Sequence, residues 1–238
     1  MREVFLRTED LQTTKIEVDV DAIGYKNRFA WLFSIFVKHE TSQTNRYEEF
    51  LEIKETLIIS LTHNDKAKYV GSRKIGEWSE IYFYTSTSKE LNQIVATVLK
   101  GTNFIYESNV VKDIQWNFYQ HELFPTELEY HHITSDKIIE QLKDEGDMLD
   151  TPRDVEHYIS FDTPTQKQRF LDNLNIDGFK YKDDIDTDEF EHGIALVCFQ
   201  PITNDIMKNN IQKIYPHIKK ENGYYEGWST LLVEDEEI

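Results

Sequence analysis

The sequence predicts an α+β protein made of two tandem ferredoxin-like units, each a βαββαβ α/β sandwich with an antiparallel sheet and helices on one face. Segments with the twofold alternation of strands and segments with the 3.6-residue repeat of helices follow one another in the order β-α-β-β-α-β, and this order occurs twice. The chain has 238 residues, which suits two domains of about 100–150 residues each. An aperiodic stretch near the middle separates the two repeats.

The first repeat is expected to form a domain over residues 1–126. Residues 1–28 show little periodicity, although Ile16, Val18 and Val20 alternate with acids and predict a short edge strand. The aromatic-rich segment from Asp113 to Pro125 is expected to pack over the edge of this domain. Strands are expected at 31–37, 66–74, 77–84 and 103–110, and helices at 47–61 and 88–100, with Ser88 as N-cap and Gly101 as terminator.

A linker is expected over 127–133, followed by the second domain over 134–238. Residues 193–199 are apolar on both faces and predict a central strand that is buried on both sides, or nearly so. Residues 178–183 are polar and predict an edge strand. The other strands are expected at 154–161 and 224–232, and the helices at 134–145, 164–174 and 203–219.

The closing strand combines two glycines with three aromatic residues and one carboxylate. Gly223 is expected to end the preceding helix in a left-handed cap, because glycine adopts that conformation at little cost. In a regular strand Glu226 and Trp228 would share one face, and Tyr225 and Gly227 the other. As the fourth strand this segment would lie at a sheet edge.

Charge is distributed unevenly along the chain. The net charge is −18, to which residues 1–126 contribute 15 − 18 = −3 and residues 127–238 contribute 11 − 26 = −15. Such a C-terminal half should repel nucleic-acid phosphates and attract basic proteins. The single cysteine, Cys198, fits a reducing compartment, and the longest apolar-rich run, 29–37, is too short to span a bilayer. We therefore expect a cytoplasmic protein that binds neither membranes nor nucleic acid directly.

Catalytic and cofactor motifs do not match the sequence. Asp184, Asp186 and Asp188 are spaced like the start of a calcium loop, but Glu189 stands where glycine is required and Ala195 where a bidentate glutamate belongs. There is no P-loop, no dinucleotide fingerprint and no nucleophile elbow. We expect no cofactor, no metal and no catalytic residues.

A cluster of polar residues surrounds the first strand of the second repeat. Gly146 and Asp147 precede it, and Arg153 is expected to pair with Asp147 or Glu156. His157 falls on the apolar face of the strand, which predicts a hydrogen-bonded histidine in the core.

These motifs resemble the RraB family, the regulators of ribonuclease E activity B, over about residues 134–232. The resemblance is carried by Gly146-Asp147, by Arg153-x-Val155-Glu156-His157 and by Gly223-x-Tyr225-Glu226-Gly227-Trp228-x-Thr230. The family's closing motif has Asp at the position of Glu226 and Glu at the position of Ser229. It implies a ferredoxin-like sandwich without a cofactor and an inhibitory contact with an RNA-degrading endonuclease. Gly146, Asp147, Arg153, His157, Gly223 and Gly227 would be the structural part of the motif.

The first half is similar to DUF695, a bacterial domain family of unknown function that brings no established activity. The similarity rests on Glu55 and Leu57, on Glu80 and Tyr84, and on Asp113-x-x-Trp116-x-x-Tyr119 followed by Pro125.

Together these features predict a non-enzymatic regulator that binds a basic protein, possibly a ribonuclease. Contacts are expected from exposed parts of Glu156, Tyr225, Glu226 and Trp228, with Asp184, Asp186 and Asp188 steering association. Two alternatives remain open: an acidic immunity-type or nucleic-acid-mimicking inhibitor of a toxin, and a metal-assisted hydrolase that uses His157. The oligomeric state is left open.

Overall fold

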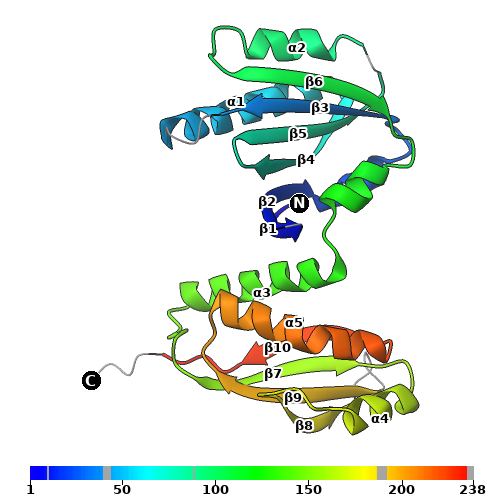
Figure 1. Cartoon of the computed structure of the whole chain (residues 1–238), viewed down its shortest axis with the longest axis vertical. Coiled ribbons are helices and arrows are strands. Elements are labelled where there is room, and N and C mark those ends of the chain that lie inside the picture. Colours follow the sequence, from blue (N-terminus) through cyan, green and yellow to red (C-terminus); the bar gives the residue numbers. More distant parts are fainter. Residues whose placement is uncertain (10, 40–43, 88, 187–191, 235–238) are drawn as a thin grey trace. The chain divides into compact units, whose positions relative to one another are not determined.

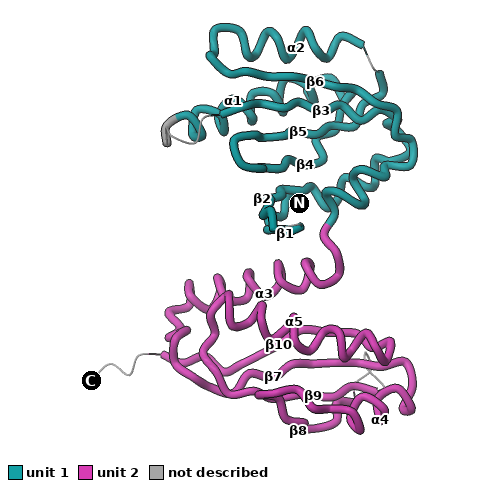
Figure 2. Tube along the Cα trace, in the orientation of Figure 1, with its two compact units in different colours: residues 1–124 teal, residues 125–238 magenta. Residues whose placement is uncertain are grey.

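The chain folds into two compact units, which Figure 2 shows in different colours: unit 1 is Met1–Phe124 and unit 2 is Pro125–Ile238. The computed structural model describes residues 1–238 except 10, 40–43, 88, 187–191 and 235–238. Both units combine an antiparallel sheet with helices, so the predicted α+β class is confirmed. Asp188 and Ser88, to which the sequence assigned roles, lie outside the described residues.

Unit 1 contains the predicted βαββαβ series with two additional strands in front of it (Figure 1). Its elements are β1 (Arg2–Glu9), β2 (Gln12–Asp19), the 3-10 helix η1 (Val20–Tyr25), β3 (Trp31–Lys38), α1 (Thr44–Thr62), β4 (Ala67–Ile75), β5 (Trp78–Thr85), α2 (Leu91–Val98), β6 (Ile105–Lys112) and the π-helical turn η2 (Tyr119–Leu123).

The sheet of unit 1 has the order β1-β2-β4-β5-β3-β6, in which the last four strands have the ferredoxin-like arrangement. The hairpin β1–β2 pairs with β4 through residues 15–18. The alternation at 16–20 thus did mark a strand, but β2 lies inside the sheet and β1 forms the edge. For the same reason β4 is not the edge strand that a bare four-stranded topology requires.

Both faces of this sheet are covered. On one face α1 and α2 pack on Phe33, Ile35, Ile81 and Phe83. On the other face the segment after β6 packs on the sheet, and Trp116 stacks on Tyr84 with ring centroids 3.9 Å apart. The prediction that residues 113–125 cover the domain's edge was therefore wrong. The alternating aromatic residues of β5 provide a second apolar face, which this segment buries.

Unit 2 contains the second βαββαβ series after one leading helix. Its elements are α3 (Glu127–Asp144), β7 (Arg153–Ser160), α4 (Pro164–Asp172), β8 (Lys180–Ile185), β9 (Gly193–Gln200), α5 (Asn204–Lys220) and β10 (Tyr224–Thr230). The sheet order is β10-β7-β9-β8, so β9 is central and β8 and β10 are edges, as predicted.

The leading helix α3 begins earlier than expected. Thr126 is its N-cap and forms a capping box with Glu129, in which each side chain bonds the other residue's backbone N–H. The expected linker at 127–133 is therefore helical. Helices α3, α4 and α5 contribute to one core against the sheet, which includes Ile139, Phe170 and Ile211.

Candidate functional site

A buried ion pair joins the two ends of the loop between α3 and β7. The Arg153 guanidinium donates to both carboxylate oxygens of Asp147, and one of these bonds is 2.9 Å long. Asp147 also accepts from the backbone N–H of Val233 at 3.1 Å, and Arg153 donates to the carbonyl of Leu231 at 3.2 Å. The predicted pairing of Arg153 with Asp147 is confirmed. It attaches the segment after β10 to the start of β7, which is a structural role.

His157 lies in the core of unit 2 with 0% of its surface exposed. Its Nδ1 is 2.8 Å from the Tyr225 hydroxyl and its Nε2 is 3.6 Å from the Cys198 thiol. Burial lowers the pKa of His157 to about 3 and raises that of Cys198 to about 12. The imidazole is therefore uncharged near neutral pH, and the predicted core histidine is confirmed.

A β-bulge in β10 places both large aromatic residues of the closing motif in the core. Tyr225 pairs with Ile159 and Gly227 with Tyr158, so the register shifts between them. Tyr225 and Trp228 consequently point to the helix face and are 3% and 6% exposed. Trp228 Nε1 donates to the Ser135 hydroxyl of α3 at 3.0 Å.

The bulge corrects two expectations for β10. Tyr225 and Trp228 share a face, whereas regular alternation placed them on opposite faces. Their burial also contradicts the expectation that both side chains present a surface to a partner. Gly227 at φ 130° has a backbone that other residues rarely adopt, and it makes the bulge possible.

The turn between α5 and β10 assigns a different role to Gly223 than the sequence suggested. The left-handed residue is Asn222 at φ 54°, while the N–H of Gly223 bonds the carbonyl of Ile218 at 3.0 Å. This is a Schellman motif with asparagine at its left-handed position. Gly223 is required for space, since a Cβ there would lie 2.6 Å from the ring of Phe161.

None of the described helices packs on the opposite face of the unit 2 sheet, and we call it the open sheet face. Strand register assigns alternate residues of β7 and β9 to it, and side-chain contacts place two β10 residues there. Phe199 is 71% exposed on this face. The rest of the strand at 193–199 is buried or half-buried on both sides, so the expectation of burial on both sides, or nearly so, is confirmed except at Phe199. The face includes Asp154, Glu156, Tyr158, Ser160, Val197, Phe199, Glu226 and Ser229, and Lys180 and Lys182 of β8 lie beside Val197 and Glu156.

Hydrogen bonds tie the polar residues of the open sheet face together. Tyr158 and Ser229 join β7 to β10 through hydroxyls 2.7 Å apart. The Ser160 hydroxyl donates to Glu226, and Lys182 of β8 donates to Glu156. Two of the expected contact residues, Glu156 and Glu226, therefore lie on one surface.

The expected steering acids lie elsewhere. Asp184 of β8 pairs with Lys167 of α4 at 2.7 Å and accepts from the Tyr181 hydroxyl at 2.8 Å. The hydrogen bond from Lys167, followed by that from Tyr181, lowers the pKa of Asp184. Asp186 is exposed just beyond β8. Asp184 is thus partly neutralised, while Asp186 keeps its access to solvent.

Sequence reasoning missed several residues of the open sheet face, among them Tyr158, Phe199 and Ser229. Alternation in β7 already places Tyr158 with Glu156, so this signal was present. Phe199 was taken for a core residue because both faces of its strand are apolar. Ser229 could not be assigned, because the bulge in β10 changes the alternation before it.

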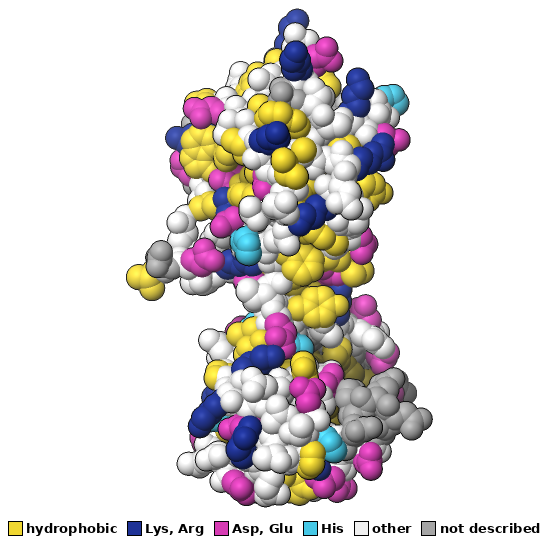
Figure 3. Space-filling model, turned by 90° about the vertical axis from the view of Figure 1, so that its right-hand side faces the viewer, with side chains coloured by type: hydrophobic (Ala, Val, Ile, Leu, Met, Phe, Trp, Pro, Cys, Tyr) yellow, Lys and Arg dark blue, Asp and Glu magenta, His cyan; other side chains and the backbone are white. Residues whose placement is uncertain are grey.

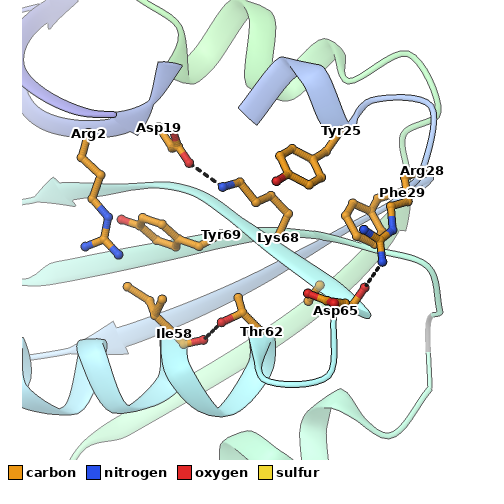
Figure 4. Close-up of a pocket in the computed structure, with 11 residues that line it drawn as sticks. Arg2, Asp19, Tyr25, Arg28, Phe29, Ile58, Thr62, Asp65, Lys68 and Tyr69 are labelled. Carbon is orange, nitrogen blue, oxygen red and sulfur yellow. Dashed lines mark hydrogen bonds and ion pairs between the residues drawn. The ribbon is translucent and has the colours of Figure 1, made fainter. Parts of the chain in front are cut away.

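A cavity of about 320 Å³ lies in unit 1, between η1, the end of α1 and β4. Its cations are already paired: Lys68 with Asp19 at 2.7 Å, and Arg2 with Glu55 at 3.0 Å. Arg28 donates to the carbonyl of Asp65 at 3.1 Å (Figure 4). The polar lining of this cavity therefore forms a self-contained network around Tyr25 and Tyr69.

Clusters of metal-ligating side chains and membrane-spanning helices are both absent from the described part of the chain. No group of three or more His, Cys, Asp or Glu side chains is placed to hold a metal ion there. Among its helices, none is long and apolar enough to cross a membrane.

Comparison with known families agrees with the division into two units. No curated protein matches the chain. Residues 132–230, from α3 to the end of β10, match the model of the family "Regulator of ribonuclease activity B", RraB. Residues 38–124, from the end of β3 to the end of unit 1, match a "Family of unknown function (DUF695)". The C-terminal unit is thus similar to the RraB family and the N-terminal unit to DUF695, as the sequence motifs indicated.

Proposed function

We propose that unit 2 is a non-enzymatic regulator that inhibits or modulates an RNA-degrading endonuclease through direct protein contact. The observation that carries this proposal is the RraB match, which covers the whole βαββαβ series of the unit and its leading helix. The residues that carry the motif resemblance, Asp147, Arg153, Tyr225 and Trp228, lie within the matched range and maintain the fold that presents the open sheet face.

The open sheet face is the contact surface of this proposal. It presents exposed Phe199 and half-buried Tyr158 near the carboxylates of Asp154, Glu156 and Glu226. Exposed aromatic residues beside polar groups are typical of the centre of protein interfaces. The carboxylates give this surface a preference for arginine-rich segments, because a guanidinium binds a carboxylate with two hydrogen bonds.

Net charge supports a basic partner. Unit 2 carries 11 Lys and Arg against 26 Asp and Glu, a net charge of −15. On the side of the molecule drawn in Figure 3, basic side chains lie among the acidic ones, so the excess does not form one uninterrupted acidic surface there. We infer that the charge of unit 2 steers association, with Asp184 and Asp186 contributing, and that the open sheet face provides specificity.

The structure leaves little basis for the hydrolase alternative. His157, the residue on which that alternative depended, is fully buried and bonded on both ring nitrogens to Tyr225 and Cys198. A general base must reach the proton that it removes, and this imidazole has no access to substrate.

The test measures binding of the full chain to a ribonuclease E-type endonuclease that includes its arginine-rich RNA-binding segment. We expect Glu226→Lys and Phe199→Ala each to weaken binding by about tenfold, which corresponds to ~1.4 kcal/mol. Glu140→Lys makes the same charge change on the exposed side of α3 and serves as the matched control. Binding should weaken with added salt, because charge attraction is screened.

RNA cleavage by the endonuclease is measured in parallel, with unfolding in urea to confirm that each variant is folded. Saturating protein should change the cleavage rate, and Glu226→Lys should require a higher concentration. Equal losses of binding in Glu226→Lys and Glu140→Lys would exclude the open sheet face. An unchanged cleavage rate at saturation would exclude regulation of this enzyme class.

A further inference from the structure

A second, smaller cavity in unit 1 lies between α1 and the helix-covered face of the sheet, and it is unusually basic. Its volume is about 140 Å³. Lysines 15, 54 and 74 line it together with the hydroxyls of Ser72 and Ser79, and Glu17 is the one acid among its lining residues. None of these residues belongs to the surface proposed above for unit 2.

Strand register brings these polar groups into one row. Lys15 of β2 lies directly opposite Lys74 of β4, and Lys74 lies directly opposite Ser79 of β5. Directly paired residues of neighbouring strands point to the same face, so the three side chains are neighbours beneath α1. Glu17 and Ser72 form the next row in the same way.

The charges in this cavity are unbalanced. Glu17 accepts from Lys54 at 2.8 Å and from the Tyr69 hydroxyl at 2.7 Å, so its oxygens are already engaged. Within the described residues, Lys15 and Lys74 form no ion pair with a carboxylate. Two like charges directly opposite each other on adjacent strands destabilise a sheet, and an anion between them would remove that cost.

The inner end of the cavity provides a fixed hydroxyl. Ser79 Oγ lies 3.0 Å from His39 Nε2, and both side chains are buried. Desolvation, with a smaller contribution from Lys74, lowers the pKa of His39, which favours the neutral imidazole beside Ser79. The aromatic ring of Tyr47 closes another side, with the Lys74 ammonium 3.7 Å from its centre.

We propose that this cavity binds a phosphate-type oxyanion, held by Lys15 and Lys74 with hydrogen bonds from Ser72 and Ser79. Lysine ammonium and serine hydroxyl groups together supply the donors that a phosphate group requires. The size of the cavity selects the ligand class, because 140 Å³ is well below the ~300–1,000 Å³ of pockets for drug-sized ligands. The occupant is therefore inorganic phosphate or the phosphate group of a small monoester.

The larger cavity of unit 1 provides the contrast that makes this assignment specific. There the ammonium of Lys68 has Asp19 at 2.7 Å and the guanidinium of Arg2 has Glu55 at 3.0 Å. In the smaller cavity Lys15 and Lys74 lie directly opposite each other, and neither forms an ion pair with a carboxylate among the described residues. The two cavities thus differ in charge balance, although both are lined by basic and aromatic residues.

The test follows binding of inorganic phosphate to the full chain by calorimetry, with chloride at the same ionic strength as reference. We expect Lys74→Met to raise the dissociation constant of phosphate at least ~10-fold, because the central ammonium is lost. Without phosphate the same variant should unfold at an equal or higher temperature than the wild type, because the repulsion from Lys15 is removed. Lys112→Met, at the far edge strand β6 of the same sheet, should leave both quantities unchanged.

O-phosphoserine forms the second arm of the experiment. Tighter binding of O-phosphoserine than of phosphate assigns the cavity to a phosphorylated ligand, and binding of phosphate alone assigns it to the free ion. Equal effects of phosphate and chloride at matched ionic strength would overturn the proposal. So would phosphate affinity in Lys74→Met equal to that of the wild type.

Discussion

The two units have the same order of four strands in their sheets but differ in what covers the second face. In unit 1 the segment after β6 buries Trp116, Tyr119 and Leu123 against that face, and none of the three is exposed. In unit 2 no described segment packs on the equivalent face in this way, and Phe199 is 71% exposed.

This difference follows from where each sequence places its aromatic residues. The β5 strand of unit 1 alternates Tyr82 and Tyr84 with Ile81 and Phe83, so both of its faces are apolar and each needs a covering layer. Strand β7 of unit 2 places Asp154 and Glu156 on its second face, which remains hydrated. The same topology can therefore have its second sheet face covered or exposed. The outcome depends on whether the residues of β5 or β7 on that face are aromatic or charged.

The largest expected effect concerns the covered second face of the unit 1 sheet. Trp116→Ala should destabilise unit 1 by about 3–5 kcal/mol, because it removes a buried ring and leaves a cavity beside Tyr84. The lost hydrogen bond from Trp116 Nε1 to the carbonyl of Phe29, 2.7 Å long, adds to this cost. Unfolding in urea, followed by tryptophan fluorescence, measures the change.

Phe199→Ala is the matched substitution on the open sheet face. It should change the free energy of unfolding of unit 2 by less than about 0.5 kcal/mol, because an exposed ring leaves no cavity. A loss as large as that of Trp116→Ala would mean that the open sheet face is covered in solution, and the contrast between the units would fail.

A further effect concerns the pH dependence of unit 2. The pKa of His157 is about 3 in the folded protein and ~6.5 in an unfolded chain. Between these values the unfolded state binds more protons, so stability rises with pH and is lost as the pH falls from 6.5 towards 3. His157 alone should contribute up to about 1.4 kcal/mol of lost stability for each pH unit in that range.

The measurement compares urea unfolding of the wild type and of His157→Gln between pH 4 and 7. Glutamine keeps a hydrogen-bonding group near Tyr225 but does not titrate, so the slope of stability against pH should be shallower in the variant. An NMR titration gives a direct check. If the His157 ring signals shift with a midpoint near pH 6, the imidazole is accessible and the hydrolase alternative would regain its basis.

Periodicity alone predicted most of the fold, because buried faces impose their spacing on the sequence. The central position of β9 and the edge position of β8 both followed from apolar content. The start of α3 was also predictable, because Thr126 and Glu129 have the spacing of a capping box. The lack of periodicity over residues 125–132 predicted a linker there instead. The hairpin β1–β2 was harder, because its exposed residues Val4 and Leu6 weaken the alternation.

The candidate site was less predictable, because its geometry depends on contacts between distant residues. The bulge at Gly227 reverses the alternation of β10, and a single sequence gives no sign of whether a glycine marks a bulge or a turn. The distinction between buried Tyr225 and exposed Glu226 therefore needed the structure. Likewise, the row of Lys15, Lys74 and Ser79 exists only through the pairing of three strands.

A last pair of substitutions tests the turn before β10, where the family motif meets the core of unit 2. Gly223→Ala should destabilise the unit by about 1–3 kcal/mol, because its Cβ would overlap the Phe161 ring at 2.6 Å. Asn222→Gly should instead stabilise it by less than about 1 kcal/mol, since Asn222 at φ 54° occupies a conformation that glycine adopts more easily. Urea unfolding of both variants gives the two signs. If Asn222→Gly were the more damaging change, the Asn222 side chain would have a role beyond ending α5. The steric requirement for glycine at position 223 would then not explain this part of the motif.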